Sequence, residues 1–161
     1  MSENNIQHDT SGVRFPPPFY YLIGLLIGFL IQRFYPIYLA KPGHRIITDV
    51  LGGIWIFLGL LLAGWAVLVF RRAGTSPIPH RPTTALALDG PYRLTRNPMY
   101  LAMALICVGI GLAFNMLWPL VSVPVVMVIV DRMVIAREER YLESKFGDQY
   151  RDYLKRVRRW I

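Results

Sequence analysis

Apolar residues fall in long blocks along this sequence of 161 residues, and short polar segments separate the blocks. The four blocks run over 19–40, 46–70, 99–114 and 116–130. Blocks of this length and composition are typical of helices that cross a bilayer. Asn115 alone separates the last two blocks, which predicts a tight antiparallel hairpin. We therefore predict an all-α, polytopic membrane protein with four transmembrane helices.

The rest of the chain fits one domain that covers residues 1–161. Residues 1–18 form a polar N-terminal segment, and it lacks the positive charge, short apolar run and small-residue site of a cleavable signal peptide, so we expect none. At the other end, apolar residues recur at steps of three and four, which predicts an amphipathic cytoplasmic helix lying on the lipid headgroups. These residues are Leu142, Phe146, Tyr150, Tyr153, Leu154, Val157 and Trp160. We expect Gly147 to stop this helix and Asp148 to restart it.

Charge supports a membrane location and suggests an orientation. The sequence is 54% hydrophobic, only 17% charged, and has a formal net charge of +8. Basic residues bind nucleic acid or an anionic membrane surface. Here they cluster at the ends of apolar blocks, at 71–96 and 137–159, which favours the membrane and disfavours nucleic acid. The positive-inside rule then predicts that both termini are cytoplasmic, with the lipid bilayer as the main partner.

Metal chemistry is not expected. Cys107 is the single cysteine, it lies inside an apolar block, and the three histidines have no metal-binding spacing. Gly109 and Gly111 also lie inside an apolar block, where close helix packing is the favoured explanation and cofactor contact is the alternative.

The polar segment before the third block contains the first candidate site. Asn97 is a favourable N-cap and Pro98 suits the first helical position, so the third helix should begin here. The free backbone donors of a helix start attract anions, and Arg96 adds a partner for a carboxylate or phosphate. A well-capped helix with a cytoplasmic arginine is the structural alternative.

Aromatic residues flank this helix start. Gly90 and Pro91 predict a turn that directs Tyr92 back toward it. Tyr92 and Tyr100 could offer aromatic faces to a sulfonium or ammonium cation. The aromatic belt at membrane interfaces is the alternative explanation.

A carboxylate pair follows the fourth apolar block. One of Glu138 and Glu139 could bind the ammonium group of a ligand that resembles an amino acid. Alternatively, the pair forms a solvated surface with nearby arginines. These arginines are Arg132, Arg137 and Arg140.

Three motifs in order resemble the isoprenylcysteine carboxyl methyltransferase-like family, which is allied to the phospholipid methyltransferases. They are DGPYRLTRNPMY at 89–100, REERYL at 137–142 and FGDQY at 146–150. The resemblance covers about residues 70–161 and implies an integral-membrane enzyme that uses S-adenosylmethionine. It implies a cofactor pocket built from Tyr92, Arg96, Asn97, Tyr100, Glu138 and Glu139. It favours Glu139 over Glu138 for cofactor contact.

The resemblance implies methyl transfer to a membrane-borne or amphiphilic acceptor, namely a lipid amine, a carboxylate or a thiol. An amine acceptor must lose a proton, and Glu139 or Tyr92 is the candidate catalytic base. The isoprenylcysteine enzymes typically have histidine at the position of Asn97, so this chain is more similar to the phosphatidylethanolamine methyltransferases. The competing hypothesis is a non-enzymatic small membrane protein that supports transport, metal tolerance or a larger assembly.

Overall fold

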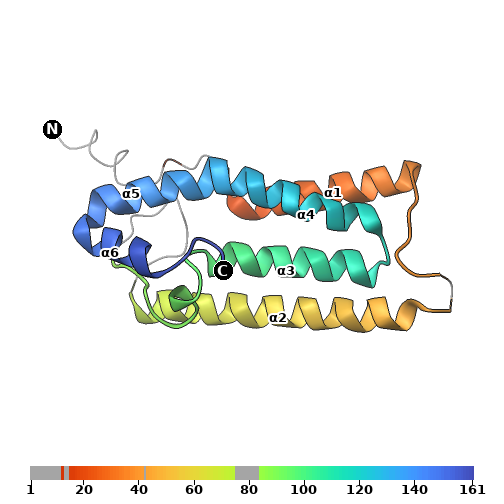
Figure 1. Ribbon diagram of the computed structural model, residues 1–161, viewed down its shortest axis with the longest axis horizontal. Coiled ribbons are helices and arrows are strands. Elements are labelled where there is room, and N and C mark those ends of the chain that lie inside the picture. Colours follow the sequence, from red (N-terminus) through yellow and green to blue (C-terminus); the bar gives the residue numbers. More distant parts are fainter. Residues whose placement is uncertain (1–11, 13–14, 42, 75–83) are drawn as a thin grey trace.

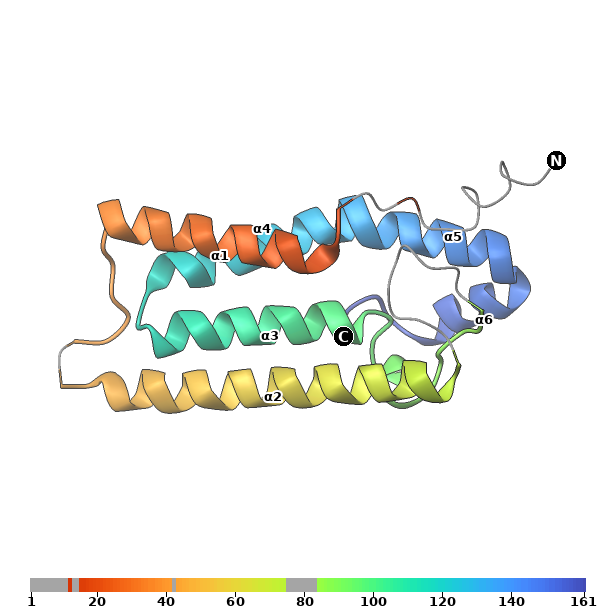
Figure 2. The same ribbon diagram turned by 180° about the vertical axis from the view of Figure 1, so that it is seen from behind.

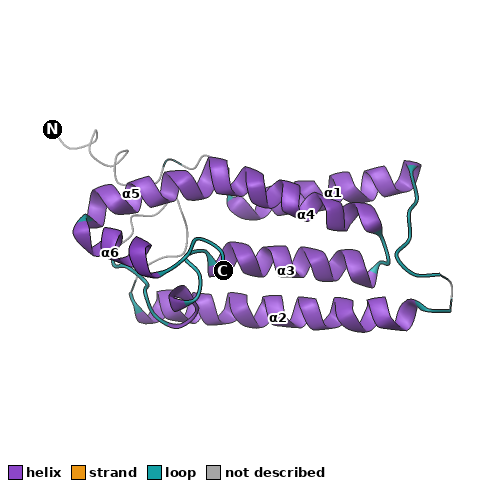
Figure 3. Cartoon of the chain, viewed as in Figure 1, coloured by secondary structure: helices purple, strands orange, loops and turns teal. Residues whose placement is uncertain are grey.

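The computed structural model describes residues 12, 15–41, 43–74 and 84–161. Most of the predicted N-terminal segment 1–18 lies outside the described residues. The described part is helical, with one isolated β-bridge between Tyr38 and Met116 (Figure 3). Its helices are α1 (Pro17–Phe34), α2 (Arg45–Arg72), η2 (Gly90–Arg93), α3 (Pro98–Ala113), α4 (Leu117–Val130), η3 (Asp131–Ile135), α5 (Ala136–Phe146) and α6 (Asp148–Arg156).

The long helices lie side by side along the longest axis (Figures 1 and 2). Helix α3 packs between α2 and α4, and α4 packs against α1. The α1–α2 connection and the α3–α4 turn lie at one end of the bundle. Helices α5, α6 and η2 lie at the other end, together with the start of α3 and the C-terminal residues.

Among the described residues, three helices are long and apolar enough, by length and composition, to cross a membrane: α1, α2 and the continuous helix from Leu117 to Phe146. Large apolar side chains such as Leu26, Leu30 and Phe57 are exposed on α1 and α2, as expected for surfaces that face lipid. Helix α3 is apolar but has 16 residues, which gives about 24 Å against a hydrocarbon thickness of about 30 Å. The membrane character is confirmed, and the count of four spans stays a prediction.

Glycines allow the helices to approach closely. A Cβ on Gly109 would lie 2.7 Å from the carbonyl oxygen of Gly52 in α2. A Cβ on Gly111 would lie 2.8 Å from the side chain of Leu120 in α4. Both glycines therefore serve helix packing, which is the favoured of the two explanations. Gly109 is 11 residues beyond Pro98, about 16 Å along α3 from the helix start.

The predicted α3–α4 hairpin is confirmed. Asn115 adopts a left-handed backbone conformation with φ of 57°. Its side chain also joins this turn to the α1–α2 connection, because its Oδ1 accepts from the backbone nitrogen of Ala40 at 2.8 Å and its Nδ2 donates to the oxygen of Ala40 at 2.9 Å. This buried amide therefore helps to hold the two loops together, alongside the backbone hydrogen bond from Leu117 to Ile37.

The C-terminal region confirms one expectation and corrects another. Gly147, with φ of 54°, separates α5 from α6 as predicted. Helix α6 ends at Arg156, however, and Val157 is extended, so the expectation of a helix through Trp160 is wrong. Trp160 does not serve as a headgroup anchor on a helix. It packs against the core cluster between α1, α3 and α4, because the non-helical residues 158–161 bind back to the start of α3.

Candidate functional site

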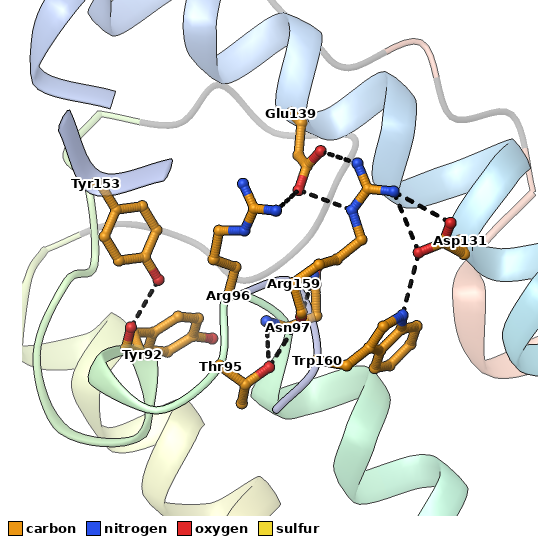
Figure 4. A network of polar contacts seen from close by, with 9 residues as sticks. All are labelled: Tyr92, Thr95, Arg96, Asn97, Asp131, Glu139, Tyr153, Arg159 and Trp160. Atoms are coloured by element: carbon orange, nitrogen blue, oxygen red, sulfur yellow. Dashed lines mark hydrogen bonds and ion pairs between the residues drawn. The ribbon is translucent and has the colours of Figure 1, made fainter. Parts of the chain in front are cut away.

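The candidate site lies where the start of α3, the helix η3–α5 and residues 158–161 meet (Figure 4). The turn at η2 leads into it. Gly90 has φ of 58°, which favours glycine, and Tyr92 is buried after it. The Tyr153 hydroxyl of α6 donates to the backbone oxygen of Tyr92 at 2.7 Å. Arg93, in contrast, is exposed and pairs with Asp89.

The start of α3 differs from the predicted cap. Asn97 occupies the N-cap position and Pro98 begins the helix, but no side-chain cap hydrogen bond forms. Instead, Asn97 Nδ2 donates to the backbone oxygen of Arg159 at 3.0 Å, and the Thr95 hydroxyl donates to the same oxygen at 3.0 Å. The Arg96 backbone nitrogen donates to the oxygen of Arg158 at 3.0 Å. The C-terminal backbone thus accepts from three donors in the segment just before α3.

Arg96 and Glu139 form an ion pair across the site. Arg96 Nη2 lies 3.3 Å from Glu139 Oε1, and each side chain is only 14% exposed. Arg96 Nε is buried and has no hydrogen-bond partner in the described structure. A buried donor without a partner carries the full cost of its desolvation. Arg96 is therefore incompletely satisfied by the protein alone.

Arg159 is the other cation on Glu139. It contacts both Glu139 oxygens, through Nε at 3.1 Å and through Nη2. Its Nη1 also lies 3.1 Å from Asp131 Oδ2. Asp131 Oδ1 accepts from Trp160 Nε1 at 3.1 Å. Figure 4 shows this continuous network from Arg96 to Trp160.

The π-helical segment η3 explains how Asp131 and Glu139 reach the same arginine. Each α-helical residue turns by about 100°, so side chains eight positions apart point about 80° apart. A π-helical turn holds one extra residue, which reduces this offset to about 20°. Both carboxylates therefore point toward Arg159.

Glu138 lies in a different environment from its neighbour. The buried Tyr100 hydroxyl donates to Glu138 Oε1 at 2.7 Å. The arginines that the sequence offered as partners are directed elsewhere: Arg132 lies 3.8 Å from Asp131, and Arg140 Nε donates to the oxygen of Ala136. The glutamate pair is therefore not an ordinary solvated ion-pair surface.

The structure brings all the candidate site residues to one end of the bundle. These residues are Tyr92, Arg96, Asn97, Tyr100, Glu138 and Glu139. Sequence analysis missed Thr95, Asp131, Arg159 and Trp160. Asp131 carried a weak signal, as an acidic residue directly after an apolar block. Arg159 carried none, because it looked like one more basic residue of the predicted surface helix.

The site brings charged groups of both signs together. Two guanidinium groups, of Arg96 and Arg159, face the carboxyl groups of Asp131, Glu138 and Glu139. Burial raises the pKa of the Tyr92 phenol above its ordinary value, and Tyr153 and Glu138 add to this shift. Tyr92 therefore stays protonated at neutral pH. In the part of the chain that the structure describes, no three or more histidine, cysteine, aspartate or glutamate side chains are arranged so that they could hold a metal ion.

Comparison with known proteins identifies a family. The phospholipid methyltransferase family matches residues 47–149, which include the polar segment before α3 and the glutamate pair but not Arg159. A protein from Haemophilus influenzae, described as uncharacterized, is 43% identical over 65 residues, which are 39% of this chain and the whole of that protein. No solved structure matches significantly. Since the family match covers more than half of the chain, this protein belongs to the phospholipid methyltransferase family.

Proposed function

We propose that the protein transfers a methyl group from S-adenosylmethionine to a membrane-borne, amphiphilic acceptor. Family membership indicates a methyltransferase that acts on lipid-like substrates in the membrane. S-adenosylmethionine supplies an electrophilic methyl group on a sulfonium. The chain's own residues bind and orient the reactants, and positioning of this kind contributes about 7–11 kcal/mol to catalysis.

The unpartnered Nε of Arg96 is the observation that carries this proposal. A guanidinium group binds a carboxylate through two parallel hydrogen bonds. Arg96 has one long ion pair and one unused buried donor, so it can accept the carboxylate of an amino-acid ligand. The partial positive charge at the start of α3 favours the same anionic group.

Glu138 is the better candidate for the ammonium group. Both oxygens of Glu139 already contact Arg159, whereas the described contact of Glu138 is one hydrogen bond from Tyr100. This argues against the preference for Glu139 that the sequence resemblance implied. Tyr92 and Tyr100 lie beside Glu138 and can face the sulfonium.

The acceptor is a lipid amine, a carboxylate or a thiol, and Asn97 in place of histidine favours the lipid amine. An amine would need a base. Burial raises the pKa of Tyr92, so its phenol stays protonated and is a poor proton acceptor. Glu139 is already paired with Arg159. We therefore assign the base role to neither residue, and Glu138 is already committed to the ammonium group. The competing hypothesis of a non-enzymatic membrane protein requires that no such cofactor binds.

The test is calorimetric titration of the detergent-purified protein with S-adenosylmethionine. Losing a charge-assisted hydrogen bond costs about 1.5–3 kcal/mol, so Arg96→Ala and Glu138→Gln should each weaken binding about tenfold to hundredfold. Glu143→Gln is the matched control, because Glu143 is a half-exposed residue of α5 that pairs with Arg151 on the surface.

Thermal unfolding of each variant shows that it is folded. Absence of binding by wild-type protein at millimolar cofactor would refute the function and favour the non-enzymatic hypothesis. Normal binding by both site variants would refute the site.

A further inference from the structure

Arg159 contributes to the site through two separate parts. Its backbone oxygen accepts from Thr95 and Asn97 and so holds residues 158–161 against the start of α3. Its side chain does something different, because the guanidinium lies between Glu139 and Asp131. A substitution of the side chain therefore leaves the backbone contacts in place, and the two contributions can be tested separately.

The ion pair between Arg96 and Glu139 opposes ligand binding. To bind a carboxylate, Arg96 must exchange Glu139 for the ligand. Both side chains are 14% exposed, and an unpaired charge at such a site is strongly unfavourable. If Arg96 were the sole cation on Glu139, the glutamate would hold it back.

Arg159 resolves this conflict. It engages both Glu139 oxygens in addition to the Arg96 contact. We propose that Arg159 is a positioning residue that neutralises Glu139 permanently and thereby frees Arg96 to bind the carboxylate of the amino-acid part of the cofactor. This proposal rests on the proposed function and adds a role for a residue outside the matched region 47–149.

The contacts of Arg159 are those expected of a permanent counter-ion for Glu139. Its Nη1 contacts both oxygens of Asp131, at 3.3 and 3.1 Å, and Asp131 is only 18% exposed. Trp160 donates to the same carboxylate and packs against the core cluster. Asp131 and Trp160 therefore fix the guanidinium beside Glu139. Arg96 has no such anchor on its unpaired Nε.

The test compares two probes that differ in the amino-acid part. S-adenosylhomocysteine carries the carboxylate and ammonium, and 5′-methylthioadenosine lacks both. In calorimetric titration, Arg159→Gln should lower the affinity for S-adenosylhomocysteine about tenfold and leave the affinity for 5′-methylthioadenosine unchanged. The matched control is Arg156→Gln, which removes an exposed positive charge three residues away and should leave both affinities within about twofold.

Removing the negative charge of Glu139 gives the more decisive measurement. Glu139→Gln should bind S-adenosylhomocysteine at least as tightly as wild type, because nothing then holds Arg96 back. The double variant Arg159→Gln with Glu139→Gln should recover wild-type affinity within about threefold. A purely structural role for Arg159 predicts no such recovery. The Glu139→Gln result stands even if Arg159→Gln alone does not fold.

The outcomes separate the two proposals. Wild-type protein that binds neither probe overturns the proposed function and this inference together. Wild-type binding with an unaffected Arg159→Gln variant overturns this inference alone. This inference alone is also overturned if Glu139→Gln lowers the affinity for S-adenosylhomocysteine about tenfold or more, since Glu139 would then be the ammonium ligand.

Discussion

Replacing Gly52 by alanine is expected to weaken the contact between α2 and α3. A Cβ at this position would lie 2.6 Å from the backbone nitrogen of Ala113 and 2.8 Å from the backbone oxygen of Gly109. Both are backbone atoms, so no side-chain rotation relieves the overlap. The two helices must separate locally.

The size of this separation sets the expected loss. Ordinary contact begins at 3.4 Å, so the new Cβ must retreat by about 0.8 Å, and a gap of that size forfeits about a quarter to a half of the dispersion energy of each contact it opens. Overpacking of this kind costs about 1–3 kcal/mol. For a chain of this length, the corresponding decrease in Tm is about 2–12 °C.

The assay is thermal unfolding of the detergent-purified protein, with Gly53→Ala as the matched control. A Cβ at Gly53 meets no atom within 4 Å, and alanine favours a helix more than glycine does, so this variant should keep or raise the Tm. An unchanged Tm for Gly52→Ala, or an equal loss for Gly53→Ala, would refute the close approach of α2 and α3.

Two further predictions concern the α3–α4 turn and the membrane orientation. Asn115→Gly keeps the left-handed backbone but removes both hydrogen bonds to Ala40, so the free energy of unfolding should fall by about 1–3 kcal/mol, measured by thermal unfolding; no loss would show that these two hydrogen bonds do not stabilise the fold. If both termini are cytoplasmic, cysteine at Lys41 should react with an impermeant thiol reagent applied outside intact cells, and cysteine at Ser144 should not; the reverse pattern would invert the topology.

The helices could be predicted from the sequence because their signals are local. The apolar blocks located α2 and α4 within a few residues, and Asn115 and Gly147 marked the turns correctly. The first helix ends at Phe34 rather than continuing to residue 40, because Pro36 cannot continue a helix and disfavours the helical conformation at Tyr35 before it. These outcomes follow from length, periodicity and breaker residues alone.

The site was only partly predictable because half of it depends on contacts between distant segments. Nothing in the local sequence ends α6 at Arg156, since no glycine or proline follows it. The helix ends there because the oxygens of Arg158 and Arg159 are taken by donors about 60 residues earlier, at Thr95, Arg96 and Asn97. Sequence periodicity carries no information about such a pairing.

The π-helical turn at η3 gives one continuous helix two independent orientations. On its N-terminal side, α4 is oriented by its packing against α1 and α3. On its C-terminal side, α5 has the orientation in which Glu139 reaches Arg96. Substitution at the exposed Arg132 or Met133 leaves the angle between the two parts intact. Gain or loss of one residue would instead rotate α5 by about 100° and carry Glu139 away from its partners. As related sequences diverge, the exposed positions of this segment are therefore free to change, whereas its length is constrained.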